Sequence, residues 1–580
     1  MPDPEPSLTG CRWTIKPADE EAVGRLVGQL RLSRLTARTL ICRGVSDPEE
    51  ARQFLSHDLQ ALPDPFLMKD MDRGVALVEE ALARGSLIRV YGDYDVDGVC
   101  ATALIVRALR RLGAKVDWYI PHRIDEGYGV NEEAVRQAKE EGVGLLITVD
   151  CGSTAVAEVA LARQLGLEVL VTDHHRPEAQ LPSAPVLNPW RADCAYPFKD
   201  LAGVGVAFKL IAAVARTRGL PEGAEFAFLD LVCLGTIGDV VPLLGENRLL
   251  VQHGLHRIGR SKKPGITALV EAAGIDAGVG ARHVAFGLAP RINAAGRMEH
   301  AEAAVNLLLT ADRAEAQQLA AYLCEQNDRR RAQEQEIAAE AHELVAREVD
   351  LSREKVIVLA SERWHPGVIG IVASRLVERY HRAALLIAVS EGVGKGSGRS
   401  IAALNLWEAL RECAPLLTRF GGHHYAAGFG VNAERVPDLR RRINEVADQW
   451  LTEEDLVREI AADSEADLSD LSVDAVGELS RLAPFGMGNP APLIVTRSLE
   501  VCETTRVGNA KHLALRLRAD SDHPAEAIWF GQGPLGDRLP QGACVDICHR
   551  PRLDEWQGNV RVRLHVEDMR LRGANAPCQA

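Results

Sequence analysis

The sequence feature that most constrains the fold is a series of short apolar runs, each separated from the next by a helical pattern. Strands that alternate with helices indicate βαβ units and a parallel sheet, so we expect an α/β fold. The expected strands are 87–91, 116–120, 145–149 and 169–172. In open α/β sheets, ligands bind at the carboxyl edge of the strands. The residues that follow these runs are therefore the first candidates for a functional site.

The motif YGDYDVDG, residues 91–98, places three aspartates after the first expected strand and before a helix expected at 98–112. If this stretch is extended, the spacing of Asp93, Asp95 and Asp97 points all three carboxylates to one side. Such carboxylates repel one another unless a cation lies among them. The simpler alternative is an acidic turn that caps the helix. A calcium loop of the EF-hand type is excluded, because its twelfth position is a leucine and a strand precedes it.

Acids and histidines also follow other apolar runs. LLITVDCGS contains Asp150, VLVTDHH contains Asp173, His174 and His175, and LGTIGDVVPL contains Asp239. Taken singly, each has an ordinary explanation, because Asp is common after strands and a lone His is usually a satisfied polar residue. We expect four strand ends with such side chains to meet at one edge of the sheet. Mixed carboxylate and imidazole ligands favour manganese or magnesium over zinc.

The rest of the chain divides into further units, as expected for 580 residues. Residues 1–70 have a helical pattern, and 71–310 form the expected parallel-sheet domain. Residues 311–349 contain no Pro or Gly and predict one long helix that connects two domains. A smaller α/β domain is expected at 350–455. Short β-like runs within 456–580 predict a small β-barrel.

Composition limits the classes of function. Charged residues interrupt every apolar run that could span a bilayer, and the N-terminus does not resemble a signal peptide, so we expect a cytoplasmic protein without a membrane partner. The 12 cysteines have no framework spacing, which favours reduced thiols. A net charge of −14 argues against a protein that coats duplex DNA, but it permits a local basic track.

The motifs DYDVDG, VDCG, DHH and GDVVP together resemble the four motifs of the DHH phosphoesterase superfamily, and FGGHHYAAGF resembles the glycine-rich signature of the DHHA1 domain. Other segments are similar to the RecJ family of single-strand-specific 5′→3′ exonucleases, and the resemblance covers roughly residues 70–570 in order. One departure is Gly238, where most relatives are expected to have Ala. The segments similar to RecJ are PRINAAGRM (290–298), WHPGVIGIVASRL (364–376), GKGSGRSI (394–401) and PFGMGNP (484–490).

The resemblance implies two divalent metal ions, Mn²⁺ or Mg²⁺, which are roughly 3.5–4 Å apart and share one water. It places Asp95 and Asp97 on different ions and makes Asp150 the bridging, catalytic ligand. His175 faces the scissile phosphate and donates a hydrogen bond or a proton, with a structural His as the alternative. Asp93 is either a ligand or a neighbour of the ligands. The implied metal set is Asp93, Asp95, Asp97, Asp150, His174 and Asp239.

The resemblance also implies residues that hold the strand. Arg123, Arg297 and Arg399 are candidates for the 5′-terminal phosphate, because guanidinium groups match phosphate oxygens bidentately. Taken singly, each would more often be a surface ion-pair partner. Ser397 and the glycine amides around it form a candidate anion nest. His423, in the glycine-rich loop, is expected near the nucleic acid.

The barrel resembles an OB-fold, whose grooves bind single strands by stacking and charge. A solvated strand face is an equally good interpretation of Arg516 and Arg518. The candidate contacts are Lys511, Arg516, Arg518, Trp529 and Trp556.

The implied function is a 5′→3′ exonuclease that degrades single-stranded DNA to 5′-mononucleotides in DNA repair and recombination. A helicase and a single-strand-binding protein are candidate partners, and a monomer is expected. One alternative is a DHH phosphodiesterase that acts on short oligonucleotides or cyclic dinucleotides, but such an enzyme does not need the barrel. A second alternative is a non-catalytic scaffold for nucleic acid. Such a scaffold should have lost the acids, and they are all present.

Overall fold

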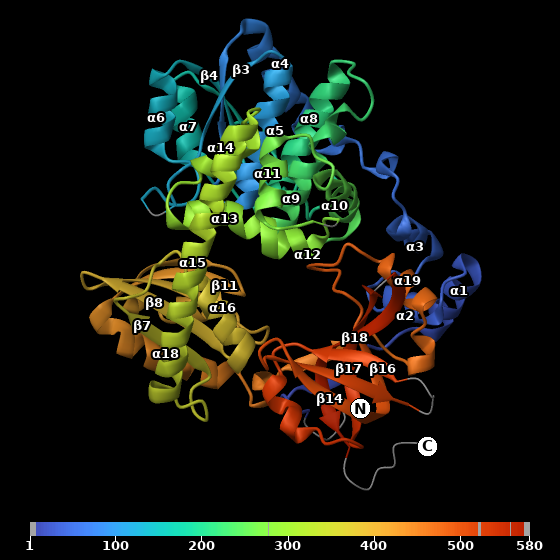
Figure 1. Cartoon of the computed structure of the whole chain (residues 1–580). Coiled ribbons are helices and arrows are strands. Elements are labelled where there is room, and N and C mark those ends of the chain that lie inside the picture. Colours follow the sequence, from blue (N-terminus) through green and yellow to red (C-terminus); the bar gives the residue numbers. More distant parts are fainter. Residues whose placement is uncertain (1–6, 124, 277, 520–523, 557, 573–580) are drawn as a thin grey trace.

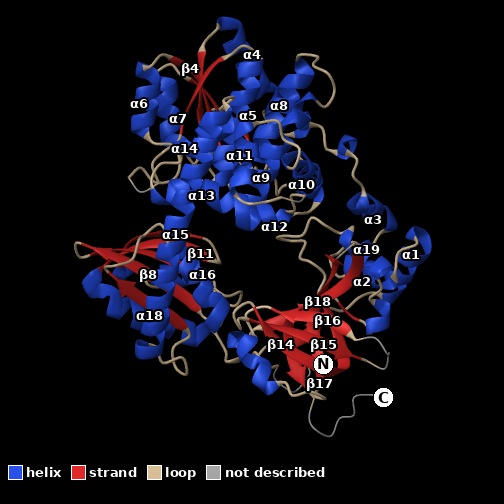
Figure 2. Ribbon diagram, viewed as in Figure 1, coloured by secondary structure: helices blue, strands red, loops and turns tan. Residues whose placement is uncertain are grey.

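The computed structural model describes residues 7–123, 125–276, 278–519, 524–556 and 558–572. Figure 1 shows a parallel-sheet domain at the top, a second α/β domain at the lower left and a β-barrel at the lower right. Figure 2 shows that helices dominate the upper domain, whereas strands dominate the barrel. Within the described residues, no helix is both long enough and apolar enough to cross a membrane.

The upper domain contains the predicted parallel sheet, with strand order β3-β2-β4-β5-β6. Side chains alternate between the two faces of this sheet, and each face has its own apolar core. Helices α5 (Val96–Arg111) and α8 pack in one core, and α6 and α7 pack in the other. The α/β fold is therefore confirmed. The predicted bounds are correct for β2, and the other three strands begin one or two residues earlier. The strands are β2 (Leu87–Tyr91), β3 (Lys115–Tyr119), β4 (Val143–Val149), β5 (Glu168–Thr172) and β6 (Val186–Leu187), and the helices include α4 (Met71–Arg84), α6 (Glu132–Glu140), α7 (Val156–Gln164) and α8 (Gly203–Thr217).

The helix after the three aspartates begins earlier than expected. Helix α5 spans Val96–Arg111, so Asp97 lies in its first turn and the three aspartates are not one extended stretch. The reason is Asp95, whose carboxylate accepts hydrogen bonds from the backbone N of Asp97 at 2.8 Å and of Gly98 at 3.1 Å. Such an N-cap fixes where a helix starts. The expectation of a common direction for all three carboxylates is therefore wrong.

Asp239 follows a helix and not a strand, which is a second correction. The apolar run before it forms α9 (Leu229–Gly238), and Asp239 is its C-cap. Helix α9 is buried on all sides because α5, α8 and α10 (Gly245–Ile258) contact it. A short run that is apolar all round has no helical period, and the sequence cannot distinguish it from a buried strand.

The predicted long helix is present as α15, Arg313–Glu348. Ala316, Ala320 and Leu323 in its first half belong to the core of the parallel-sheet domain. Ile337 and Val345 in its second half belong to the core of the next domain. The helix therefore connects the two domains through apolar packing at both ends.

The second α/β domain has a mixed five-stranded sheet, ordered β10-β11-β9-β8-β7. Only β7 and β8 are parallel, and the other neighbours are antiparallel. Helices α15 and α16 cover one face, and α17 and α18 cover the other. The elements are β7 (Val356–Ser361), α16 (Ile369–Tyr380), β8 (Ala383–Ser390), β9 (Val393–Arg399), α17 (Leu406–Arg411), β10 (Leu417–Gly422), β11 (Ala426–Asn432) and α18 (Val436–Trp450).

The C-terminal strands form the predicted barrel, which closes because β14 pairs with both β15 and β17. The N-terminal segment packs against it, so that the two ends of the chain share one apolar core. This segment is helical as expected, but it also contains strand β1, which pairs in parallel with β12. The elements are β1 (Arg12–Ile15), α1 (Glu20–Leu30), α2 (Arg34–Ile41), α3 (Pro48–Leu55), β12 (Glu459–Ala462), α19 (Val473–Ser480), β14 (Ile494–Val507), β15 (His512–Arg518), β16 (Ala525–Trp529), β17 (Cys544–Trp556) and β18 (Asn559–Leu571).

Candidate active site

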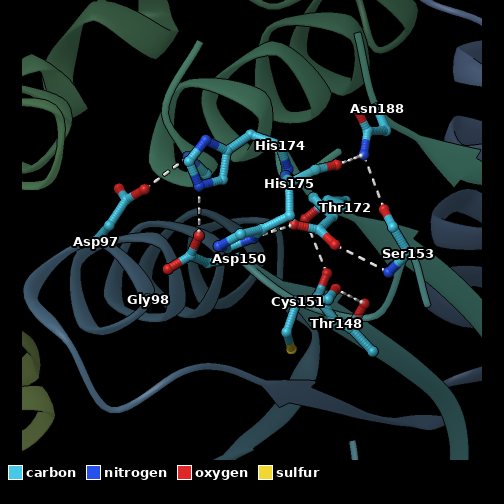
Figure 3. Close-up of polar contacts among 12 residues, drawn as sticks. Asp97, Gly98, Thr148, Asp150, Cys151, Ser153, Thr172, His174, His175 and Asn188 are labelled. Atoms are coloured by element: carbon cyan, nitrogen blue, oxygen red, sulfur yellow. Dashed lines mark hydrogen bonds and ion pairs between the residues drawn. The ribbon is translucent and has the colours of Figure 1, made fainter. Parts of the chain in front are cut away.

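Three neighbouring strands of the parallel sheet end at the candidate site. Asp93 follows β2, Asp150 follows β4, and His174 follows β5, as expected for a site at the carboxyl edge. Nε2 of His174 lies 3.1 Å from Oδ1 of Asp150 and 3.6 Å from Oδ2 of Asp239 (Figure 3 shows the first pair). Asp150 has a φ of 61°, a strained conformation for a residue with a side chain. Such strain is typical of functional sites.

The six residues proposed as metal ligands form adjoining groups. Within each group, one potential ligand atom per residue lies within 4.8 Å of the others. Asp150 belongs to two of the groups, which is consistent with a bridging position. His175 also lies within reach of Asp150 and His174. The groups are Asp93, Asp95 and Asp150; Asp97, His174 and Asp239; and Asp150, His174 and His175.

The donor atoms of this cluster fit a cation. Among the described residues, Oδ1 of Asp93, Oδ1 of Asp150, Nε2 of His174 and Oδ2 of Asp239 are buried without a hydrogen-bond partner. A buried polar atom without a partner costs about 1–3 kcal/mol, more if it is charged. Cations held by the adjoining groups would satisfy these atoms.

The electrostatics of the cluster support the same conclusion. Burial and the charge of Asp95 raise the pKa of Asp93 to about 8. Burial and neighbouring carboxylates raise the pKa of Asp97 and Asp150 well above the usual range. Burial lowers the pKa of His174, which favours the neutral form that binds metals. A cation among the carboxylates reverses their preference for protons.

Glycines allow the backbone to approach the carboxylates. A Cβ at Gly203 would lie 2.5 Å from Oδ1 of Asp150, and one at Gly235 would lie 2.6 Å from Oδ1 of Asp97. Asp97 also accepts hydrogen bonds from the backbone N of Gly203, at 2.6 Å, and of Val204. These bonds orient the carboxylate at the N-terminus of α8, where partial positive charge stabilises an anion.

The presence of Gly at position 238, where relatives are expected to have Ala, has a structural explanation. A Cβ at this position would lie 2.0 Å from Cγ1 of Val96, in the DYDVDG motif. Real Cβ atoms do not approach other atoms so closely, so Val96 and Gly238 are matched to each other in this chain.

Asp173 holds His175, a role that the sequence analysis did not assign. Its Oδ1 lies 2.8 Å from Nδ1 of His175, and its Oδ2 accepts a hydrogen bond from the backbone N of Ser153 at 2.9 Å. Burial disfavours charge on His175, but Asp173 and the nearby carboxylates outweigh it and raise its pKa to about 9. The hydroxyl of Tyr128 lies 2.9 Å from the same Nδ1. Asp173 begins the DHH triplet, which was the only signal for it in the sequence.

The three candidate arginines come from separate segments and gather beside the carboxylate cluster. Arg297 lies in α13 (Ala289–Met298), Arg399 ends β9, and Arg123 lies over the ring of Tyr94 at 4.7 Å. Burial and the charges of Arg123, Arg330 and Arg399 lower the pKa of Arg297 to about 10. Within the described part of the chain, Arg123, Arg297 and Arg399 form no ion pair.

Ser397 adjoins this group and shares a glycine cradle with Arg399. Nη1 of Arg399 donates a hydrogen bond to Oγ of Ser397 at 3.2 Å. A Cβ at Gly370, at the start of α16, would lie 2.8 Å from Oγ of Ser397 and 3.1 Å from Nη2 of Arg399. The helix N-terminus and the two side chains therefore face the same small space, which suits an anion.

His423 lies apart from this group. It follows β10 in the hairpin with β11, its side chain is exposed, and its backbone N donates to the carbonyl O of Ala426. Its imidazole makes no hydrogen bond or ion pair among the described residues. Its assignment to substrate binding stays a prediction.

The barrel candidates differ in exposure. Trp529 is 1% exposed and packs in the barrel core, so the expectation that it stacks on a strand is wrong. The reason is the alternation along β16, which turns Trp529 inward and leaves the next residue, Phe530, 51% exposed. Arg516 and Arg518 pair with Glu503 and Glu500 of β14, as on a solvated strand face. The side chain of Trp556 lies outside the described residues.

Comparison with known proteins identifies the three units. Family models match residues 87–236 (DHH family, N-terminal domain), 353–449 (DHHA1 domain) and 462–568 (RecJ OB domain). The single-stranded-DNA-specific exonuclease RecJ of Bacillus subtilis is 41% identical over 96% of this chain and 70% of its own length. The Escherichia coli enzyme of the same name is 37% identical over 93% of this chain and 96% of its own length.

Solved structures of RecJ exonucleases are also similar to this chain. RecJ from Thermus thermophilus in complex with Mn²⁺ matches with a TM-score of 0.83 and 36% identity, over 97% of this chain and 80% of that one. An exonuclease RecJ bound to manganese is 43% identical over 67% of this chain and 96% of that one, with a TM-score of 0.59. With three family domains in order and relatives similar over nearly the whole chain, this protein belongs to the RecJ family of the DHH phosphoesterase superfamily.

Proposed function

We propose that this protein is a metal-dependent exonuclease that degrades single-stranded DNA from the 5′ end to 5′-mononucleotides. The observation that carries the proposal is the meeting of two charge groups. Burial and the charge of Asp95 raise the pKa of Asp93, and Arg123 lies near enough for its charge to oppose that rise. The charge of Asp95 likewise acts on Arg297, so the arginines adjoin the buried carboxylates. One group suits divalent cations and the other suits a phosphate. Relatives named single-stranded-DNA-specific exonucleases support the choice of substrate.

The cluster would hold two divalent ions, Mn²⁺ or Mg²⁺, with Asp150 between them. When bound, such ions lower the pKa of a shared water and neutralise charge on the phosphate oxygens. The protein orients the reacting groups around them. Asp97 is fixed by the backbone of α8. Asp173 holds His175, whose side chain is 41% exposed and so is open to a substrate. His175 would donate a hydrogen bond or a proton to the scissile phosphate.

The arginine group explains why the enzyme would remove nucleotides from an end. Arg123, Arg297, Ser397 and Arg399 would bind the 5′-terminal phosphate through charge-assisted hydrogen bonds. A strand without an end cannot place a terminal phosphate there. The polarity of the reaction then follows from which end carries the phosphate.

The remaining units would hold the strand beyond the cleaved bond. The barrel supplies a surface that an enzyme for short oligonucleotides or cyclic dinucleotides would not need. We divide the chain into 1–70, 71–310, 311–349, 350–455 and 456–580. A role in DNA repair and recombination, as a monomer working with a helicase and a single-strand-binding protein, fits a nuclease of this specificity.

The test uses single-stranded DNA labelled at its 3′ end, with duplex DNA, RNA and a cyclic dinucleotide compared under the same Mn²⁺ concentration. We expect the 3′ label to remain on progressively shorter strands. Rapid release of labelled mononucleotide would overturn the 5′→3′ polarity. Faster cleavage of the cyclic dinucleotide than of DNA would favour the alternative function.

A further inference from the structure

The motif PFGMGNP, residues 484–490, has no role in the reaction as described so far. It lies between α19 and β14 of the C-terminal unit, yet it contacts the parallel-sheet domain. The backbone N of Leu243 donates a hydrogen bond to the carbonyl O of Met487 at 2.8 Å. Leu243 is 3% exposed and comes shortly after Asp239. The motif therefore touches the segment that leads away from a proposed metal ligand.

Two glycines of the motif make this contact possible. A Cβ at Gly486 would lie 2.7 Å from Cδ1 of Leu243, and a Cβ at Gly488 would lie 3.0 Å from Cβ of Pro242. Gly488 also has a φ of 69°, which residues with side chains rarely adopt. A side chain at position 486 would displace the Leu243 side chain, and one at position 488 would press on Pro242.

Buried polar groups fix the motif on the domain. Arg248 of α10 is 3% exposed, and its guanidinium donates to the carbonyl O of Arg481 at 3.1 Å and of Leu482 at 3.0 Å. Asn489 is fully buried, and its Nδ2 donates to the carbonyl O of Leu482 and of Pro484. Buried groups of this kind are costly to leave unpaired, so the contact is specific and not a loose surface approach.

The turn after Asp239 directly precedes the residues that make these contacts. Val240 has a φ of 64°, which is unfavourable for a β-branched residue, and its side chain is 59% exposed. Nδ2 of Asn247 donates to the carbonyl O of Pro242 at 3.1 Å and holds the segment from the opposite side. Among the described residues, Oδ2 of Asp239 has no hydrogen-bond partner, and its one ion-pair contact is with His174 at 3.6 Å. The backbone around Asp239 therefore contributes to the position of this carboxylate.

We propose that the loop 484–490 is a positioning element of the metal site. By holding Pro242 and Leu243, it fixes the strained turn at Val240 and, with it, the carboxylate of Asp239. The C-terminal unit then contributes to metal affinity as well as to strand binding. The inference rests on the proposed function only in assigning Asp239 to a metal ion.

The test compares Gly486→Ala and Gly486→Val with the matched control Gly477→Ala, all in the full-length protein. Gly477 lies in α19, where a Cβ would meet its nearest neighbour only at 3.9 Å. Mn²⁺ binding is measured from the electron paramagnetic resonance signal of free Mn²⁺. Single-strand binding is measured by fluorescence anisotropy with EDTA present. Nuclease rates are followed against Mn²⁺ concentration.

We expect Gly486→Val to weaken binding of one Mn²⁺ by about 10-fold, the size of effect seen when groups that orient metal ligands are lost. Gly486→Ala should have a smaller effect, because it meets only the end of the Leu243 side chain. The control should behave as the unaltered protein. Strand affinity should stay unchanged, and excess Mn²⁺ should restore the nuclease rate.

Normal Mn²⁺ affinity in Gly486→Val would overturn the proposal, whether or not the rate falls. If circular dichroism shows that this variant does not fold, Gly486→Ala and Leu243→Ala are judged by the same criterion. The measurement also separates the two proposals. Mn²⁺ binding that responds to position 486, in a protein that cleaves no strand, would contradict the proposed function and leave the positioning role intact.

Discussion

In the parallel-sheet domain the candidate site lies beyond the strand ends, whereas in the mixed-sheet domain it lies on a strand. Helices cover both faces of the parallel sheet, so only its carboxyl edge is free to bind a ligand. In β9, by contrast, Ser397 and Arg399 are spaced two residues apart, and Gly396 and Gly398 alternate with them. The two sites also carry opposite charge. The first buries carboxylates, whereas β9 contributes Arg399, which lies beside Arg123 and Arg297 of the parallel-sheet domain. Among the described residues, these three arginines form no ion pair.

This difference indicates a division of labour. The acidic edge would carry out the chemistry, and the arginines would select the end of the strand. Substitutions on the two sides should therefore change different kinetic parameters.

Asp150→Ala should lower the rate of cleavage by roughly 10³-fold or more, because it removes the carboxylate shared by two of the potential metal groups. Binding of single-stranded DNA should remain measurable by anisotropy. Asp72→Ala, an exposed aspartate in the first turn of α4, is the matched control. Normal Mn²⁺-dependent cleavage by Asp150→Ala would show that the metal assignment is wrong.

Arg399→Ala should lower kcat/KM by about 10–100-fold for a 5′-phosphorylated strand, the equivalent of one or two charged hydrogen bonds. A strand with a 5′-hydroxyl should be affected little, because it lacks the group that the guanidinium binds. Arg353→Ala, an exposed arginine of the same domain, should change neither substrate. An equal loss on both substrates would contradict a role in recognising the terminal phosphate.

Asp173→Asn should lower kcat by about 10-fold, because an uncharged amide replaces the carboxylate that pairs with Nδ1 of His175 and orients its ring. KM and Mn²⁺ affinity should stay close to normal. Asp173→Asn added to His175→Gln should reduce the rate little below that of His175→Gln alone, since Asp173 acts through His175. Fully additive losses would mean that the two residues act separately.

Gly238→Ala should destabilise the parallel-sheet domain by about 1–3 kcal/mol, because the new Cβ overlaps Val96. The midpoint of thermal unfolding, measured without metal, should fall. Val96→Ala should restore much of the loss in the double variant. If Gly238→Ala alone leaves the midpoint unchanged, the two positions are not matched as the structure indicates.

The sequence was informative where neighbouring residues carry the signal. Strand β2 has the bounds expected from the apolar pattern, and the barrel strands are present where β-like runs were expected. Asp93, Asp150 and His174 follow parallel strands, so their meeting at one edge could be predicted from the topology alone. The family resemblance added assignments that no local pattern supplies.

Other features were not visible in the sequence. The run before Asp239 is apolar on all sides because neighbouring helices bury it, and this hides its helical period. Asp97 lies in the first turn of α5 and not in an extended stretch, because Asp95 caps that helix. The side chain of Trp529 lies inside the barrel, because the strands close around it. For Asp97 the deciding contact is local, and the sequence left it open as the alternative of an acidic turn that caps the helix. For the other two features, packing against other parts of the chain decided the outcome.

The sequence by itself determined the α/β class, the set of acids and histidines, and the barrel, because apolar periodicity and strand ends are local properties. Only the tertiary structure decided that Asp173 holds His175, that β1 pairs with β12, and that residues 484–490 dock beside Asp239. The contact between Asp173 and His175 joins two neighbours that a turn of the chain brings face to face. The other two contacts join residues that are hundreds of positions apart in the sequence. Their partners are chosen by packing and by the need to pair buried polar groups, which no short stretch of sequence records.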